Sequence, residues 1–244
     1  MSETLTLANV LDDAAILSLE HQLHLQEVVG EHNWNVNLQE QRFDFTGGRA
    51  LTCSRVHLLG SAAPGPESWL WAWANPAGYP EELTALSGRV RDFGQRYGIR
   101  ELASAEVPFN ALPGGTDDPR FEPARVAAML LDAAKVVSGS WTSYHAEVGQ
   151  GTRAAFLIEH PEFRLPAPAF PRVMRVLQQS VAELPLTDHR RAVYAYAQRR
   201  QLAATFTPDH ARLTLTGPDF TVNVDFDQYN RVAGFTANSG VEAR

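Results

Sequence analysis

The chain lacks the features that mark secreted, disulfide-stabilised and membrane proteins. Its 244 residues include a single cysteine, Cys53, which excludes an internal disulfide framework and is typical of a reducing cytoplasm. The most apolar stretch, residues 68–79, contains Pro76 and is shorter than the roughly 20 residues that a membrane span needs. The opening Met-Ser-Glu-Thr has no basic segment of a secretory signal. These absences predict a soluble protein of the cytoplasm.

Lysine is nearly absent as well, because Lys135 is the one lysine among 21 basic residues. The formal net charge at pH 7 is −7. The broad basic face that is typical of nucleic-acid-binding proteins is therefore missing. We expect neither nucleic acid nor a membrane as a partner.

The charges are spread unevenly along the chain. Residues 1–41 contain seven acidic residues and no lysine or arginine, whereas residues 171–202 contain six arginines and two acidic residues. We hypothesise that the acidic opening segment faces the arginine-bearing helices, within one chain or across a homodimer. The alternative is that both are solvated surfaces, where single ion pairs contribute little.

The sequence also lacks the common motifs of catalysis and nucleotide binding. No Gly-x-Ser-x-Gly elbow, P-loop, Gly-x-Gly-x-x-Gly fingerprint or His-Glu-x-x-His pair occurs. Cys53 and His57 resemble a nucleophile and a base, but four positions along one strand would separate them by about 13 Å. We expect Cys53 to be a small buried hydrophobic residue.

Two histidines near acidic residues, His21 and His24, suggest a metal site on the first helix. A helix-bundle metal site needs a matching set of glutamates and histidines on other helices, and the sequence offers none. We therefore expect a surface histidine beside acidic residues, with no metal and no cofactor.

The most informative segment is Ser-Trp-Leu-Trp-Ala-Trp-Ala-Asn-Pro at residues 68–76, which holds three of the five tryptophans. Alternation with a period of two predicts a strand whose indoles, from Trp69, Trp71 and Trp73, share one face. Core packing is the favoured interpretation because indoles bury large areas. The other interpretation is an aromatic wall that binds an apolar ligand, with Asn75 at its end.

This segment follows an acidic helix and precedes a Pro-Glu-Glu-Leu helix start. In this arrangement the chain resembles an uncharacterised bacterial family of unknown function with a Trp-x-Trp-Ala-Trp-Ala-Asn strand motif. The resemblance covers residues 11–159. It implies a soluble bacterial α+β protein and no particular activity.

Hydrophobic periodicity predicts an α+β fold, an antiparallel sheet covered by helices. Because residues 165–171 are rich in proline, we divide the chain into a main domain, residues 1–164, and a smaller unit, residues 165–244, of two helices followed by three strands. A hairpin turning at residues 149–151 should pair Tyr144 with Phe156, Ala146 with Ala154 and Glu147 with Arg153. The expected helices span 8–29, 80–97, 123–137, 172–183 and 188–203, and the main expected strands span 33–38, 42–45, 50–59, 68–74, 141–148, 152–159, 212–216 and 220–227.

Two functional hypotheses follow. The preferred one is a non-catalytic cytoplasmic binding or interaction module, whose partner is a small apolar ligand, another protein or a second copy of the chain. The alternative is a small-molecule enzyme with a pocket against the tryptophan strand. In that enzyme His145 and Glu147, which share a strand face, would act as acid and base.

Overall fold

The computed structural model describes residues 4–115 and 122–239, which form six α-helices and three antiparallel sheets. The expected α+β class is therefore confirmed. The chain forms two compact units, residues 1–10 with 21–164 and residues 11–20 with 165–244. The expected division assigned the whole first helix to the main domain, whereas residues 11–20 of this helix group with the second unit. The division into domains of residues 1–164 and 165–244 stays a prediction.

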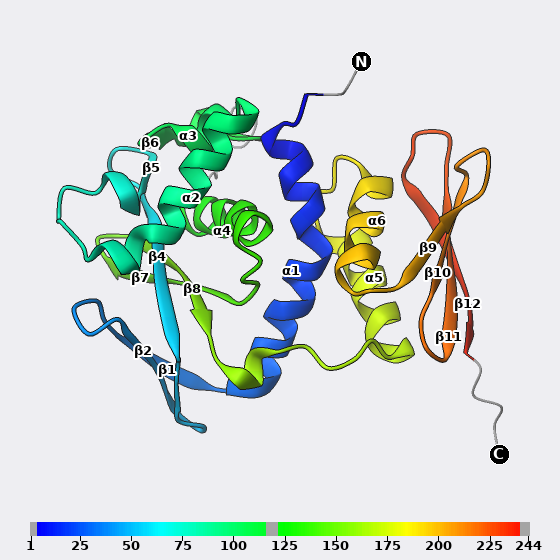
Figure 1. The fold of residues 1–244 in the computed structure, drawn as a ribbon, viewed down its shortest axis with the longest axis horizontal. Coiled ribbons are helices and arrows are strands. Elements are labelled where there is room, and N and C mark those ends of the chain that lie inside the picture. Colours follow the sequence, from blue (N-terminus) through cyan, green and yellow to red (C-terminus); the bar gives the residue numbers. More distant parts are fainter. Residues whose placement is uncertain (1–3, 116–121, 240–244) are drawn as a thin grey trace. The chain divides into compact units, whose positions relative to one another are not determined.

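The first unit contains a three-stranded and a five-stranded sheet, in the orders β1-β2-β3 and β6-β5-β4-β8-β7 (Figure 1). Helices α2 and α4 pack against strand β4 of the larger sheet, and α4 also packs against β8. The elements of this unit are α1 (Leu7–Val29, in part), β1 (His32–Asn37), β2 (Arg42–Gly47), β3 (Leu51–Thr52), β4 (Arg55–Ala63), β5 (Ser68–Trp71), α2 (Glu81–Tyr97), α3 (Arg100–Ala103), β6 (Glu106–Pro108), α4 (Pro123–Ser138), β7 (Ser143–Gly149) and β8 (Thr152–Glu159), with short 3₁₀ turns at Ala72–Ala74, Phe109–Ala111 and Pro161–Phe163.

The helix ends follow from local chemistry. Thr6 caps α1 through a capping box with Asn9, which satisfies backbone N–H groups that have no partner in the first turn. Helices α2 and α4 end at Gly98 and Gly139, both in the left-handed conformation that glycine adopts without a steric penalty. The expected bounds of these three helices are confirmed to within one residue.

Strand β8 lies inside the larger sheet and is buried from Ala154 to Ile158, as expected for a strand covered on both faces. An aromatic core joins the two sheets of this unit, because Phe43 of β2 lies 5.3 Å from Tyr144 and 5.7 Å from Phe156 between ring centroids. The predicted register of the β7–β8 hairpin is confirmed for all three residue pairs.

The tryptophan segment is a strand only in its first half. Trp69 and Trp71 lie on β5 with no exposed surface, and their rings meet edge to face at 5.2 Å. The core interpretation is confirmed for these two indoles. The prediction that Trp73 shares their face is wrong, because residues Ala72–Ala74 form a 3₁₀ turn and the half-buried Trp73 ring carries the guanidinium of Arg91 at 5.2 Å.

Gly60 of β4 lies directly against the Trp69 ring, which leaves no room for a side chain at this position. A Cβ atom at Gly60 would lie 2.4 Å from the Leu70 carbonyl oxygen and 2.5 Å from the Trp69 ring. We expect Gly60→Ala to lower the free energy of unfolding by about 1–3 kcal/mol, the usual cost of overpacking. Urea denaturation measures this loss.

The matched control is Gly65→Ala, because no atom lies within 4 Å of a Cβ built at Gly65. Its free energy of unfolding should change by less than about 0.5 kcal/mol. Equal stability of both variants would contradict the close approach of Trp69 to β4.

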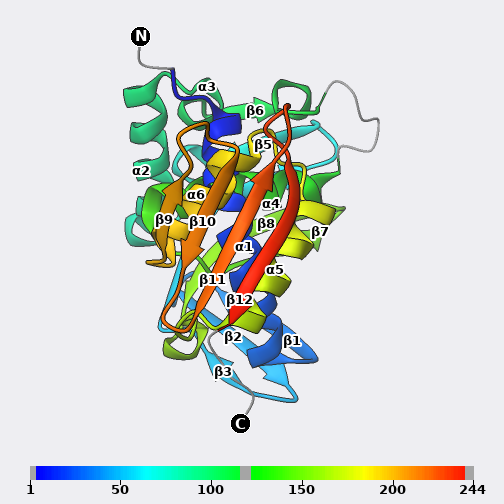
Figure 2. The same ribbon diagram turned by 90° about the vertical axis from the view of Figure 1, so that its right-hand side faces the viewer.

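The second unit combines residues 11–20 of α1 with helices α5 (Phe170–Glu183) and α6 (His189–Arg199) and a sheet in the order β12-β11-β10-β9 (Figure 2). Helix α6 packs against β9 and β10. The strands are β9 (Ala203–Phe206), β10 (Arg212–Thr216), β11 (Phe220–Phe226) and β12 (Val232–Ser239).

The prediction of three strands in this unit is wrong, because β9 forms a fourth. Helix α6 ends at Arg199 and Gln201 takes a left-handed conformation with φ 58°. No glycine marks this helix end in the sequence, so the helix was expected to continue to residue 203.

The hypothesis that acidic residues of the first helix face the arginine helices is confirmed for two pairs within this unit. Arg191 donates to both carboxylate oxygens of Asp13 at 2.7 Å. Nε of Arg200 lies 3.0 Å from a carboxylate oxygen of the fully buried Glu20. These contacts connect the second unit's part of α1 to α6.

Candidate functional site

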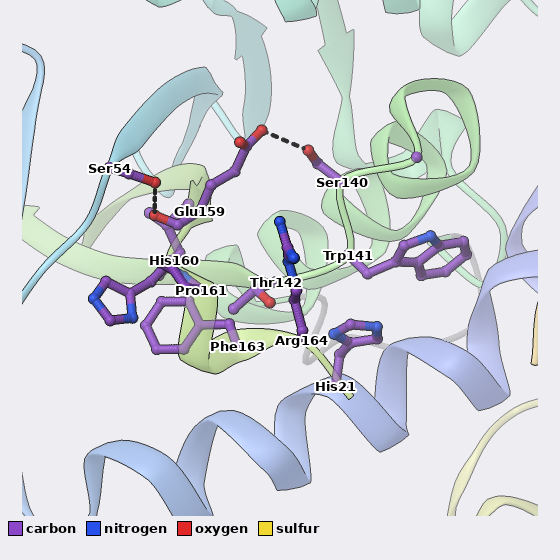
Figure 3. Close-up of a pocket in the computed structure, with 12 residues that line it drawn as sticks. His21, Ser54, Ser140, Trp141, Thr142, Glu159, His160, Pro161, Phe163 and Arg164 are labelled. Atoms are coloured by element: carbon purple, nitrogen blue, oxygen red, sulfur yellow. Dashed lines mark hydrogen bonds between the residues drawn. The ribbon is translucent and has the colours of Figure 1, made fainter. Parts of the chain in front are cut away.

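A pocket of about 360 Å³ opens in the first unit, within the range of roughly 300–1,000 Å³ that is common for small-molecule sites. Its lining comes from α1, the link between β3 and β4, the link between α4 and β7, and the end of β8 (Figure 3). The lining residues are His21, Ser54, Gly139, Ser140, Trp141, Thr142, Ile158, Glu159, His160, Pro161, Phe163 and Arg164.

Backbone hydrogen bonds hold the pocket segments together. The N–H of Ser54 donates to the Glu159 carbonyl at 2.7 Å, and the N–H of Ile158 donates to the Thr142 carbonyl at 3.0 Å. The Ser54 hydroxyl donates to the same Glu159 carbonyl at 2.9 Å. The links before β4 and β7 are thereby fixed to the end of β8, so the pocket is largely formed before a ligand arrives.

The carboxylate of Glu159 is the polar centre of the pocket. Ser140 donates its hydroxyl to Oε1 at 3.0 Å, and Nε2 of His57 lies 3.7 Å from the same oxygen (Figure 3). Both serine hydroxyls of the pocket therefore donate to oxygens of Glu159. A nucleophilic serine would instead donate to a histidine base.

Aromatic rings form another part of the lining. The rings of His21 and Trp141 stack with centroids 6.2 Å apart and an interplanar angle of 23°. Phe163 is buried and packs edge to face on Phe45 at 6.0 Å. The pocket thus combines apolar ring surface with a few polar groups, the usual composition of a ligand site.

Arg164 supplies a positive charge at the pocket. Figure 3 shows its side chain extending into the pocket. Within residues 4–115 and 122–239, no carboxylate pairs with this guanidinium, since the nearby Glu162 pairs with Arg49 and Glu159 contacts Ser140 and His57. Arg164 and Glu159 therefore line one pocket with opposite charges and do not form an ion pair with each other.

The His57 side chain is half-buried beside this pocket. Burial lowers the pKa of His57 below 6.5, because a charged imidazole loses its hydration. The Glu159 carboxylate raises this pKa in part, and the positive charges of Arg89 and Arg55 lower it further. The ring is therefore neutral at pH 7.

We expect the free energy of unfolding to fall as the pH drops below about 6.5, because the unfolded chain takes up a proton at His57 before the folded chain does. The loss is complete below the folded-state pKa. Denaturation at about pH 7.5 and about pH 5.5 measures it, and His57→Gln should remove this contribution. An NMR titration midpoint of His57 at or above 6.5 would contradict this prediction.

The residues that the sequence suggested for a ligand site do not line this pocket. Trp69 and Trp71 belong to the core, and Trp73 packs under Arg91. The side-chain oxygen of Asn75 accepts the backbone N–H of Ala77 at 3.0 Å and shapes the turn after the 3₁₀ segment. A ligand role for these four residues stays a prediction.

His145 and Glu147 lie on the same strand, β7, as expected. His145 is half-buried, and burial lowers its pKa, helped by the charges of Arg153 and Lys135. Glu147 is exposed and accepts the N–H of Gly151 in its own hairpin turn at 3.3 Å. An acid and base role for the pair stays a prediction.

Cys53 and the two helix histidines take separate structural positions. Cys53 lies between β3 and β4, so the single strand expected over residues 50–59 is wrong. Burial raises the pKa of its thiol to about 12. His21 stacks on Trp141, while Nε2 of His24 contacts the Glu162 carbonyl at 3.0 Å. In the described part of the chain, no three histidine, cysteine or acidic residues gather as a metal site would require.

Of the residues that line the pocket, the sequence singled out His21, as a candidate metal ligand, and did not point to the polar residues that face it. Ser54, Ser140, Glu159 and Arg164 stand at strand ends and in links, where no periodic pattern connects them. The one available signal was the termination of α4 at Gly139 and of β8 near Pro161, because side chains at the ends of neighbouring elements often converge.

In the described residues, none of the helices combines the length and apolar composition of a membrane span. No curated protein matches the chain, and no solved structure matches it. A family model described as "Family of unknown function (DUF6882)" matches residues 8–161, which include the pocket residues from His21 to Pro161. Because the match covers more than half of the chain, the protein belongs to this family of unknown function.

Proposed function

We propose that the protein is a non-catalytic binding protein that holds a small molecule in the pocket of its first unit. The observation that carries this proposal is the pocket itself, about 360 Å³ in volume, where stacked rings adjoin polar side chains from four separate segments. Such a concave, largely pre-formed site is the usual form of a small-molecule site. A cytoplasmic location, expected from the sequence, is part of the same proposal.

The chemistry of the lining supports binding more than catalysis. Ser54 and Ser140 donate to Glu159, so neither hydroxyl is activated by a histidine. The nearby thiol of Cys53 is buried with a raised pKa, which disfavours the reactive thiolate. These groups can orient a ligand through hydrogen bonds without attacking it.

One observation supports the alternative of an enzyme that uses His145. Nδ1 of His145 is buried without a hydrogen-bond partner in the described residues, and the lowered pKa keeps this ring neutral at pH 7. A neutral imidazole with an available nitrogen could accept a proton. The alternative is weaker because the Glu147 carboxylate is exposed and bound to its own turn.

Fluorine NMR of protein labelled with fluorotryptophan tests the proposal. The chain has five tryptophans, and the resonance lost in Trp141→Phe identifies the pocket indole. A library of metabolites is first screened for compounds that raise the melting temperature. We expect stabilising compounds to shift the Trp141 resonance and to leave those of Trp69 and Trp71 in place.

Two results would overturn the proposal. Stabilising compounds that never move the Trp141 resonance would place the binding site elsewhere. Conversion of a bound compound, detected by mass spectrometry and abolished in His145→Gln, would favour the enzyme alternative.

A further inference from the structure

We propose that the ligand of this pocket is a small zwitterion that carries an ammonium and a carboxylate, the chemical class of the amino acids. This inference rests on the proposed function of the pocket and specifies what the pocket selects. It follows from the two opposite charges, on Arg164 and Glu159, that line one pocket without pairing.

Arg164 would bind the carboxylate of the ligand. A guanidinium presents parallel N–H donors that match the two oxygens of a carboxylate. The side chain is exposed at the pocket, and no carboxylate of the described residues engages it. Its donors are therefore available to a ligand.

Glu159 would bind the ammonium. Ser140 and His57 both approach Oε1 of this carboxylate, and no hydrogen bond from the described residues reaches Oε2. The two neighbours add no charge that neutralises Glu159, because a serine is uncharged and the lowered pKa of His57 keeps its ring neutral. Oε2 thus remains a charged acceptor for an ammonium group.

A zwitterion fits this arrangement better than a ligand with a single charge. A simple anion would be attracted by Arg164 and repelled by Glu159. A simple cation would be attracted by Glu159 and repelled by Arg164. In both cases the repulsion offsets the attraction. A molecule with both charges gains from both side chains. The rings of Trp141, His21 and Phe163 provide apolar surface for the remainder of the ligand.

The test begins with the twenty proteinogenic amino acids, each added to the 244-residue protein and followed by calorimetry and by the Trp141 fluorine resonance. We expect at least one of them to bind and to shift that resonance. The best binder is then compared with its amide, which keeps only the ammonium, and with its deaminated acid, which keeps only the carboxylate. Each partial ligand should bind about tenfold or more weakly, because one charge-assisted contact is lost.

Two variants then assign each contact. Arg164→Gln should weaken the amino acid and the deaminated acid by about tenfold or more and leave the amide unchanged. Glu159→Gln should weaken the amino acid and the amide and leave the deaminated acid unchanged. This crossed pattern differs from a folding defect, which would weaken all three ligands together.

Arg100→Gln and Glu31→Gln are the matched controls, because both residues are exposed and neither lines the pocket. Their affinities should equal that of the unmodified protein. If no amino acid binds while neutral or singly charged metabolites shift the Trp141 resonance, the zwitterion inference fails and the proposed function stands. If no compound of either set binds, both fail.

Discussion

Trp71→Ala should lower the free energy of unfolding by about 3–5 kcal/mol, the usual cost of deleting a buried large aromatic side chain. The indole has no exposed surface and meets the ring of Trp69 edge to face at 5.2 Å. Its Nε1 donates to the Glu101 carbonyl at 3.1 Å, so the substitution also leaves a partly buried acceptor without its donor. Urea denaturation followed by circular dichroism measures the loss.

Trp73→Ala is the matched comparison, since it removes the same side chain two positions further along. Trp73 is half-buried and outside β5. The guanidinium of Arg91 lies over its ring, a contact of about 0.5–1 kcal/mol at exposed sites. Its loss of stability should be clearly smaller than that of Trp71→Ala. Equal losses would show that the three indoles form one surface, as the alternation of the sequence suggests.

The difference between Trp71 and Trp73 shows how far alternation in the sequence can predict the extent of a strand. Alternation placed Trp69 and Trp71 correctly because a strand continues through both residues. Nothing in the Ala-Trp-Ala sequence distinguishes a continued strand from the 3₁₀ turn that the chain adopts at Ala72–Ala74. The break at Cys53 between β3 and β4 was missed for the same reason, since local alternation does not reveal where tertiary packing stops a strand.

Features fixed by neighbouring residues were predictable. The register of the β7–β8 hairpin follows from its turn at residues 149–151 and from opposite charges on Glu147 and Arg153. The helix ends at Gly98 and Gly139 follow from the left-handed conformation that glycine adopts.

The pocket could not be predicted in this way. Its polar residues, such as Ser54, Ser140 and Glu159, are brought together by the pairing of β4 with β8 and of β8 with β7. Pairing between strands nearly 100 residues apart depends on the whole sheet rather than on local periodicity. His145 and Glu147 were chosen because they share one face of a strand, and a shared face alone did not place them at the pocket.

The second large effect concerns the ion pair of Glu20 and Arg200 in the second unit. The Glu20 side chain is completely buried and that of Arg200 is 9% exposed, with Nε 3.0 Å from the carboxylate. Arg200→Met takes a counter-charge away from the buried Glu20 carboxylate, so it should cost about 3–5 kcal/mol. Arg200 also donates to the Pro166 carbonyl at 2.9 Å. The loss of this hydrogen bond lowers the free energy of unfolding further.

The double variant Glu20→Leu/Arg200→Met separates the charge from the packing. When both charges are removed together, neither leaves the other behind without its partner, and the free energy of unfolding should recover most of the loss seen in Arg200→Met. The buried Tyr196 also lies near this pair: burial, and to a lesser extent the Glu20 carboxylate, raises the pKa of its hydroxyl. A double variant as unstable as the sum of the two single variants would show that Glu20 and Arg200 act independently, which would contradict a coupled pair. If the double variant regains the lost free energy of unfolding, the pair does not supply most of the stability of the second unit. Its role would then be to select which residues of α1 pack against α6.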